Sequence, residues 1–164
     1  MAILNIVKYP NPILRGKSKE IKEITPELKR LALNMQETMI ANKGLGLAAP
    51  QVGESKRIIV VQTENSQKAL INPKIFRKSR EMETGEEGCL CAPGLFLKIK
   101  RASVVEISAL DIDGREVKIK AEGLPARILQ HEIDHLNGIL FFDRIPFWQR
   151  LKYFLNFRKR KFLR

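Results

Sequence analysis

Residues 123–138 read Gly-Leu-Pro-Ala-Arg-Ile-Leu-Gln-His-Glu-Ile-Asp-His-Leu-Asn-Gly, and this stretch predicts a helix that carries two histidines. Residues 123–125 open the helix, and the Asn-Gly pair at 137–138 is typical of a helix end. His131 and His135 are four residues apart, so the helix places both imidazoles on one face. At that spacing the two rings can bind a single metal ion.

Glu132 stands between the two histidines and lies about 100° round the helix axis from His131. From there its carboxylate can reach a water on the metal instead of the metal itself. The alternative is that two surface histidines coincide by chance on an amphipathic helix. Because the chain has only two histidines and both fall in this pattern, we favour the metal site.

A catalytic metal site of this kind needs a third protein ligand and one open position for water. The sequence contains no third histidine, and the only acid after Asp134 is Asp143, which is too near the helix end. Cys89 is the better candidate, because it follows an acidic, glycine-containing stretch at 85–88 that can bring a thiolate to the helix. In an extended segment Cys91 points the opposite way, so we expect it not to bind. Two buried structural thiols are the alternative, since a single C-x-C is a weak signal.

The rest of the pattern predicts an α+β fold. A Thr-Pro-Glu start at 25–27 begins a helix that ends at 43–44, and a strand is expected at 57–62. Strands at 104–110 and 116–121 flank a Gly-containing turn and form a hairpin. Strands gathered between helices, without strand–helix alternation, favour mostly antiparallel sheets packed around the histidine-bearing helix, with a C-terminal helix.

Length and composition fit one domain. The chain has 164 residues, of which 44% are hydrophobic and 29% charged. Two cysteines one residue apart exclude a disulfide scaffold, and no apolar run approaches the roughly 20 residues of a membrane span. The first residues lack the apolar core of a signal peptide. We therefore expect a cytoplasmic protein without stable membrane insertion.

The charge is concentrated at the C-terminus. Lys and Arg number 30 against 18 Asp and Glu, and residues 144–164 contain basic but no acidic residues. Apolar residues recur there at helical spacing: Phe147, Trp148, Leu151, Phe154 and Leu155. This predicts a catalytic domain over 1–145 and a basic amphipathic helix over 146–164. The helix either docks on the body with solvated charges or contacts a polyanion, such as RNA phosphates or an anionic membrane surface.

Three segments, in order, resemble the motifs of bacterial peptide deformylases. They are Gly-Leu-Gly-Leu-Ala-Ala-Pro-Gln at 44–51, Glu-Gly-Cys-Leu at 87–90 and Gln-His-Glu-Ile-Asp-His-Leu-Asn-Gly at 130–138. With a similar opening at 6–15, the resemblance covers about residues 3–145. It implies hydrolysis of the N-formyl group from the formyl-methionine of nascent chains, with release of formate. Composition and spacing alone lead only to a mononuclear metal hydrolase.

The resemblance also implies roles for individual residues. Cys89, His131 and His135 would bind the metal, and Glu132 would accept the proton of the attacking water. The Gln51 amide and the Leu90 N–H would stabilise the oxyanion. Substrate binding falls to Gly44, Leu45, Gly46 and Glu87, and Glu87 is also expected to pair with Arg101.

The implied cofactor is one divalent ion. A thiolate ligand makes Fe²⁺ and Zn²⁺ chemically plausible, and the resemblance favours Fe²⁺, with Zn²⁺, Ni²⁺ or Co²⁺ able to occupy the site. The implied partners are N-formylmethionyl nascent peptides and, through the basic tail, ribosomal RNA. Two features depart from the family or exceed its common core: Cys91 stands where Ser is usual, and the basic tail after Asp143 matches none of the family's motifs.

Two other functions fit parts of the pattern. An HExxH endopeptidase would need a third ligand beyond the helix, and it would cut internal amide bonds. A basic nucleic-acid-binding module with a structural metal would need a fourth protein ligand and no open position. The sequence offers no convincing fourth ligand, and Glu132 would then have no role.

Overall fold

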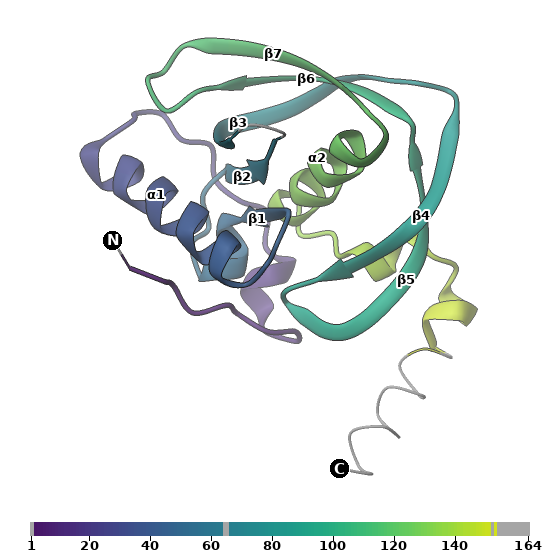
Figure 1. Ribbon diagram of the computed structural model, residues 1–164. Helices are drawn as coiled ribbons and strands as arrows, with labels where there is room; N and C mark the ends of the chain where they lie inside the picture. The colour runs from purple at the N-terminus through teal and green to yellow at the C-terminus, as the bar shows by residue number, and fades with distance from the viewer. Residues whose placement is uncertain (1, 64–65, 152, 154–164) are drawn as a thin grey trace.

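The computed structural model describes residues 2–63, 66–151 and 153, in which two antiparallel sheets lie around helix α2 (Figure 1). One sheet has the strand order β1-β2-β3-β6-β7, and the other pairs β4 with β5. The strands are β1 Gly46–Ala48, β2 Ile58–Gln62, β3 Gln67–Lys78, β4 Met82–Cys89, β5 Ala92–Ala102, β6 Val104–Leu110 and β7 Glu116–Glu122. The helices are α1 Pro26–Ala41 and α2 Gly123–Leu136, with 3₁₀ turns η1 Pro12–Arg15, η2 Ala49–Val52 and η3 Phe141–Arg144. The predicted α+β class is confirmed.

Helix α1 begins where its sequence predicts. The Thr25 hydroxyl accepts a hydrogen bond from the backbone N–H of Leu28 at 3.3 Å, and Pro26 occupies the first turn, where no backbone donor is needed. The apolar stripe of α1 packs against β1, β2 and β3 and buries Leu28, Ala32, Met35 and Met39. This packing holds β1, which carries the first of the three sequence motifs, against the body of the protein.

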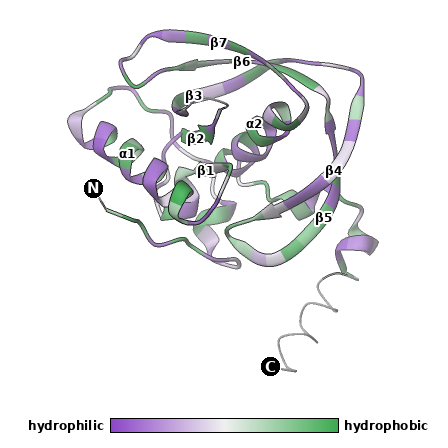
Figure 2. Ribbon diagram, in the orientation of Figure 1, coloured by the Kyte–Doolittle hydropathy of each residue, from purple (hydrophilic) through white to green (hydrophobic). Residues whose placement is uncertain are grey.

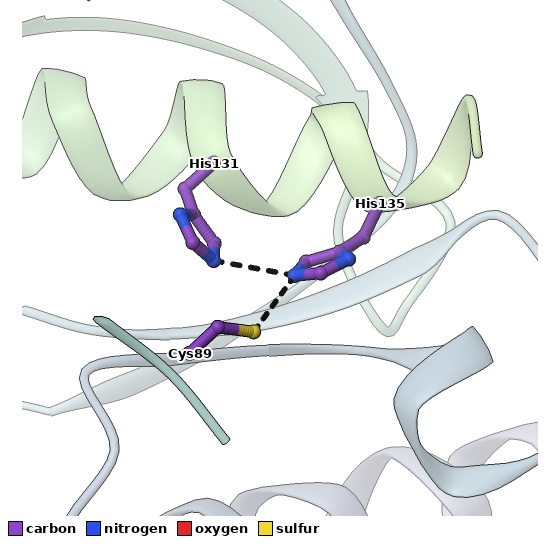
Figure 3. Close-up of side chains that lie close together, drawn as sticks. All are labelled: Cys89, His131 and His135. Atoms are coloured by element: carbon purple, nitrogen blue, oxygen red, sulfur yellow. Dashed lines mark hydrogen bonds between the residues drawn. The ribbon is translucent and has the colours of Figure 1, made fainter. Parts of the chain in front are cut away.

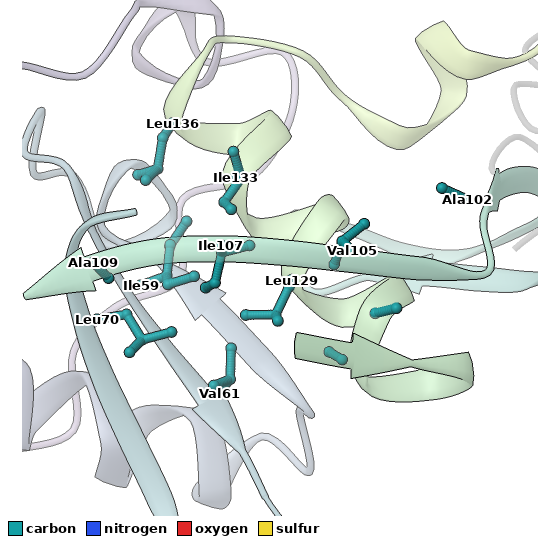
Figure 4. Packing of buried hydrophobic residues seen from close by; sticks show 13 residues of the cluster. Ile59, Val61, Leu70, Ala102, Val105, Ile107, Ala109, Leu129, Ile133 and Leu136 are labelled. Atoms are coloured by element: carbon teal, nitrogen blue, oxygen red, sulfur yellow. The ribbon is translucent and has the colours of Figure 1, made fainter. Parts of the chain in front are cut away.

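Helix α2 packs against the five-stranded sheet (Figure 4). Leu129, Ile133 and Leu136 contribute the helix side of this core, and Ile59 and Leu70 belong to the sheet side. Along β7 the hydropathy alternates from residue to residue, as expected for a strand with one face on the core and one in solvent (Figure 2). Because one face of α2 is buried in this core, the face that carries His131 and His135 is turned toward β4 and β5.

The β4–β5 hairpin forms the other wall around α2. Residues of β5, including Leu97 and Ile99, pack with Phe141 and Phe142 of η3. The tight turn between the strands consists of Leu90 and Cys91, because Cys89 pairs with Ala92. The segment is therefore not extended through Cys91. The expectation that this side chain points away from Cys89 is wrong, since their sulfurs lie 3.1 Å apart.

The C-terminal segment begins as a helix, at residues 147–151. Its apolar side chains are largely exposed: Phe147 is 55% exposed, Trp148 76% and Leu151 45%. Arg150 donates a 2.9 Å hydrogen bond to Asp143 and ties the start of this helix to η3. Phe154 and Leu155, which were predicted to continue the apolar spacing of this helix, lie outside the described residues, as do most of the basic residues of 144–164. Within the described part of the chain, every helix is too short or too polar to span a bilayer.

Candidate metal centre

Three ligand-type side chains converge between β4 and α2 (Figure 3). Cys89 comes from the last residue of β4, and His131 and His135 come from successive turns of α2. The Cys89 Sγ lies 3.2 Å from Nε2 of His135, which lies 3.2 Å from Nε2 of His131. The structure thus brings together the three residues that the sequence predicted as metal ligands.

The spacing of these atoms fits a divalent cation. Metal–nitrogen and metal–sulfur bonds of about 2.0–2.3 Å set at tetrahedral angles imply ligand–ligand distances of roughly 3.3–3.6 Å. The two 3.2 Å separations are close to that range. A sulfur and two imidazole nitrogens also form a donor set suited to iron or zinc. Asp143, which the sequence argued against as a ligand, instead binds Arg15 and Arg150.

Glu87 supports the histidine from behind. Its Oε2 lies 2.9 Å from Nδ1 of His131, and both of its oxygens accept hydrogen bonds from Arg101, at 2.8 and 2.9 Å. Burial alone would raise the pKa of Glu87, but the hydrogen bonds from Arg101 and His131 outweigh it and hold this pKa well below its usual range. Glu87 therefore stays ionised and accepts a hydrogen bond from Nδ1–H, so Nε2 is the nitrogen of His131 that can bind a cation. The predicted pairing of Glu87 with Arg101 is confirmed.

The network around Glu87 extends further than the sequence indicated. Arg127 donates to the Glu87 carboxylate at 2.9 Å and to the backbone carbonyl of Ile99 at 2.8 Å. Arg101 also donates to Asp134 at 2.5 Å, and Asp134 accepts from Arg144 as well. Arg127, Asp134 and Arg144 were not singled out from the sequence. Their partners lie 10 to 44 residues away, so no local spacing signals these contacts.

Without a bound cation, the pKa of His131 is shifted from its ordinary value. Burial alone would lower the pKa of His131, but hydrogen bonds with Cys89 and Glu87 and the charge of Glu132 raise it to about 10. The neighbouring Cys91 sulfur and burial raise the pKa of Cys89. A cation reverses both tendencies, since it binds the neutral imidazole and the thiolate.

Glu132 lies beside the triad with an unused acceptor atom. Its side chain is buried, and Oε2 has no hydrogen-bond partner among the described residues. Burial raises the pKa of Glu132 to about 7, partly opposed by the charge of His131. A carboxylate with such a pKa is suited to take up and release a proton near neutral pH. Gly46 makes room for it, because a Cβ at Gly46 would lie 2.5 Å from Oε1 of Glu132.

Gln51 is held in place by its own strand–turn segment. Its Oε1 accepts a 2.6 Å hydrogen bond from the backbone N–H of Ala48, so its Nε2 points the other way, 3.3 Å from the Cys89 sulfur. Leu90 follows Cys89 in the hairpin turn, and its carbonyl accepts a 2.8 Å hydrogen bond from Lys8. Both predicted oxyanion donors therefore lie in segments that contact the triad.

A cavity of about 510 Å³ opens beside these groups. It is bordered by all the predicted catalytic and substrate-binding residues, namely Gly44, Leu45, Gly46, Gln51, Glu87, Leu90 and Glu132. Cys89 and His131 also border it, whereas His135 is not among its lining residues. Leu124, Ile128 and Phe96, which the sequence did not single out, complete an apolar part of the wall. The cavity is of the size that holds a small peptide end.

The chain is similar to known proteins over nearly its whole length. The family model described as "Polypeptide deformylase" matches residues 3–150. A peptide deformylase of Halothermothrix orenii is 52% identical over 88% of this chain and 95% of its own, and one of Thermodesulfovibrio yellowstonii is 48% identical over 98% and 100%. The crystal structure of peptide deformylase from Ehrlichia chaffeensis in complex with actinonin is 40% identical, covers 98% of both chains and has a TM-score of 0.91.

Proposed function

Because this chain belongs to the polypeptide deformylase family, we propose that Cys89, His131 and His135 hold the divalent ion with which it acts. The chain is a hydrolase that removes the N-formyl group from the formyl-methionine of newly synthesised proteins. The observation that carries the assignment is the contact of one sulfur and two imidazoles beside Glu132, whose Oε2 has no hydrogen-bond partner in the part of the chain that the structure describes; all of these residues except His135 border one cavity. Individual residues of this chain then have separate roles in the reaction.

A divalent ion held by Cys89, His131 and His135 would supply Lewis acidity, which lowers the pKa of a water from about 15.7 towards 7. Glu132 takes the proton of the attacking water and returns it to the departing amine. Its burial and its pKa of about 7 support this role. Gln51 Nε2 and the Leu90 N–H donate to the oxygen on which negative charge develops. The hydrogen bond between Gln51 Oε1 and Ala48 supports the role of Gln51, because it fixes the amide before substrate arrives.

The substrate's methionine side chain binds in the cavity. Gly44 and Gly46 leave room beside Leu90 and Glu132, since a Cβ at Gly44 would lie 3.1 Å from the Leu90 side chain. Leu45 adds an apolar surface at the mouth, where it is 48% exposed. A flexible thioether suits an apolar wall of this kind. Glu87 borders the cavity and acts mainly by fixing His131.

The activity is tested with formyl-Met-Ala-Ser and its unformylated counterpart. Formate release from the first peptide, and no cleavage of the second, is the expected result. Cleavage of internal amide bonds would instead favour the endopeptidase. The variant Glu132→Gln keeps the side-chain shape, so we expect it to retain the metal and the fold and to lose at least about 100-fold in kcat. Retained turnover would refute the assignment of Glu132 as the base.

We propose Fe²⁺ as the native ion, with Zn²⁺, Ni²⁺ and Co²⁺ able to replace it. The sulfur-containing donor set supports an ion of this group and excludes none of its members. Protein prepared without oxygen and reloaded with each ion in turn would be compared for formate release. The highest kcat/KM is expected for Fe²⁺, and an equal or higher value for Zn²⁺ would contradict the proposal.

We further propose that residues 1–145 form the catalytic domain and that 146–164 contact ribosomal RNA in the cytoplasm. The exposed Phe147 and Trp148, and the basic residues that follow, support this division. Deletion of residues 153–164 should weaken salt-sensitive co-sedimentation with ribosomes and spare turnover of small peptides. Unchanged co-sedimentation would count against the ribosomal contact, and vesicles of anionic lipid would test the membrane alternative.

A further inference from the structure

Two thiols lie side by side at the edge of the metal centre. The sulfur of Cys91 is 3.1 Å from that of Cys89, and both are free. A disulfide bond is about 2.05 Å long, so a movement of roughly 1 Å would join them. The two residues stand on either side of Leu90 in the hairpin turn, which brings their side chains to the same side.

The two thiols are not equally accessible. Cys89 is partly exposed and borders the cavity that admits substrate. Cys91 is 1% exposed and packs in the apolar cluster with Leu97 and Phe141. A small oxidant entering the cavity therefore meets Cys89 first, and Cys91 is protected from direct attack but within reach of the Cys89 sulfur.

We propose that Cys89 and Cys91 form a peroxide-reactive modification site, in which oxidation joins the two sulfurs in a reversible disulfide. This inference rests on the proposed function of Cys89 as a metal ligand. It concerns Cys91, which lies outside the group of atoms that surround the cation position. Its consequence is regulation of the same site, because a disulfide sulfur no longer offers a thiolate to the ion.

The chemistry needs one hydroperoxide and two thiols. The Cys89 sulfur attacks one peroxide oxygen, so an S–O bond forms, the O–O bond breaks, and the second oxygen leaves as water with the thiol proton or a solvent proton. The Cys91 sulfur then attacks the Cys89 sulfur, so the S–S bond forms and the S–O bond breaks. The hydroxyl leaves as a second water with the Cys91 proton. The thiols lose two electrons and the peroxide gains them.

The position of Cys91 also decides whether the oxidation can be reversed. A sulfenic acid with no neighbouring thiol is oxidised further to sulfinic acid, which cellular thiols do not reverse. A disulfide is reduced by a dithiol. The pair thus converts an irreversible loss of the metal ligand into a reversible one.

The test uses the zinc-loaded protein, because zinc has no redox chemistry of its own. Hydrogen peroxide is added in steps, released zinc is measured with a chromogenic chelator, and the intact mass is recorded. Trypsin cuts after Arg80 and Lys98, so both cysteines lie in one peptide with the exposed Met82, and the fragment masses of that peptide assign each change to a cysteine or to the methionine. The matched variants are Cys91→Ser and Cys91→Ala, the second of which avoids burying a hydroxyl.

In the wild-type chain we expect a loss of about 2 Da at the two cysteines, release of one zinc per chain, and recovery of the cysteine mass and of zinc binding with dithiothreitol. In both variants we expect a gain of about 32 Da at Cys89 and no recovery. Oxygen adducts with a free Cys91 in the wild type, recovery of the variants, or no reaction of either would overturn the proposal. Failure of the metal assignment is distinguishable, since Cys89→Ser would then bind zinc as well as wild type before any peroxide is added.

Discussion

Oε2 of Glu87 lies 2.9 Å from Nδ1 of His131, and the opposite nitrogen of the same ring points at the Cys89–His135 pair. The carboxylate is ionised and keeps a proton on Nδ1, so a cation would bind His131 through Nε2. Arg101 and Arg127 hold Glu87 in turn. The tautomer of a proposed metal ligand is thus set by a buried ion network instead of by solvent.

Replacement of the Glu87 carboxylate tests whether its contact with His131 affects metal binding. Glu87→Gln keeps an acceptor oxygen for His131 but removes the anionic partner of Arg127 and leaves Arg101 paired with Asp134 alone. We expect metal affinity to fall about 10- to 100-fold, measured by competition with a chelator of known affinity. Lys29–Asp113 is an exposed pair, so Asp113→Asn serves as a control in which zinc affinity is unchanged. An unaltered affinity in Glu87→Gln would show that the hydrogen bond does not tune His131.

The Gly46→Ala substitution tests how closely Glu132 is positioned. The added Cβ would lie 2.5 Å from Oε1 and 2.7 Å from Cγ of Glu132, so the carboxylate must shift. Because a displacement of about 1 Å in a catalytic group costs on the order of 100-fold in rate, kcat should fall by that factor with metal content unchanged. Gly16→Ala is the matched control, since its nearest contact would be an ordinary 3.5 Å. Equal turnover in both variants would contradict the positioning argument.

The helices were predictable from sequence because their signals are local. The Thr25 cap and the i, i+4 spacing of His131 and His135 act within one or two turns, and α1 and α2 appear where those signals place them. The strand β4 was not predicted. Its acids and two glycines have low β-propensity, and its extended form depends on pairing with β5, which follows the turn.

The residues of the site, too, were predictable from the sequence only in part. His131, His135 and Glu132 follow from spacing, Cys89 follows from the lack of a better third ligand and from the stretch at 85–88 before it, and the deformylase-like motifs single out Gln51 and Leu90. Arg127 and Arg144 were missed, because an arginine that forms an ion pair and a solvated one look alike in a sequence until the fold supplies the partner. The orientation of Cys91 was wrong because its prediction assumed a strand, whereas a two-residue turn reverses the chain there.

The oxygen and the nitrogen of the Gln51 side-chain amide have different functions, which substitutions can separate. Its oxygen accepts from Ala48, and its nitrogen is the proposed oxyanion donor. Gln51→Glu keeps an acceptor for Ala48 and removes the donor, whereas Gln51→Leu removes both. We expect both variants to lose about 100- to 1,000-fold in kcat, and only Gln51→Leu to lose thermal stability as well. If Gln51→Glu kept wild-type kcat, the nitrogen would not be a donor to the transition state.

Asp143 should make stability depend on pH through its ion pairs with Arg15 and Arg150. Burial alone would raise the pKa of Asp143, but the hydrogen bonds from Arg15 and from the Leu140 N–H outweigh it and lower this pKa below its ordinary value of 3.8. A carboxyl with a lowered folded-state pKa stabilises the fold above its unfolded-state pKa, and this contribution is lost as the pH falls through the folded-state pKa.

The variant Asp143→Asn isolates that contribution. Near pH 7 its free energy of unfolding in urea should be about 1–2 kcal/mol below that of the wild type, since charged hydrogen bonds to a mostly buried group are lost. The difference should stay constant down to about pH 5 and shrink below about pH 4, where the wild-type carboxyl also becomes neutral. Metal release at low pH affects both proteins alike and cancels in the comparison. A difference that persists unchanged at the lowest pH at which both proteins fold would assign the loss to packing instead of to charge.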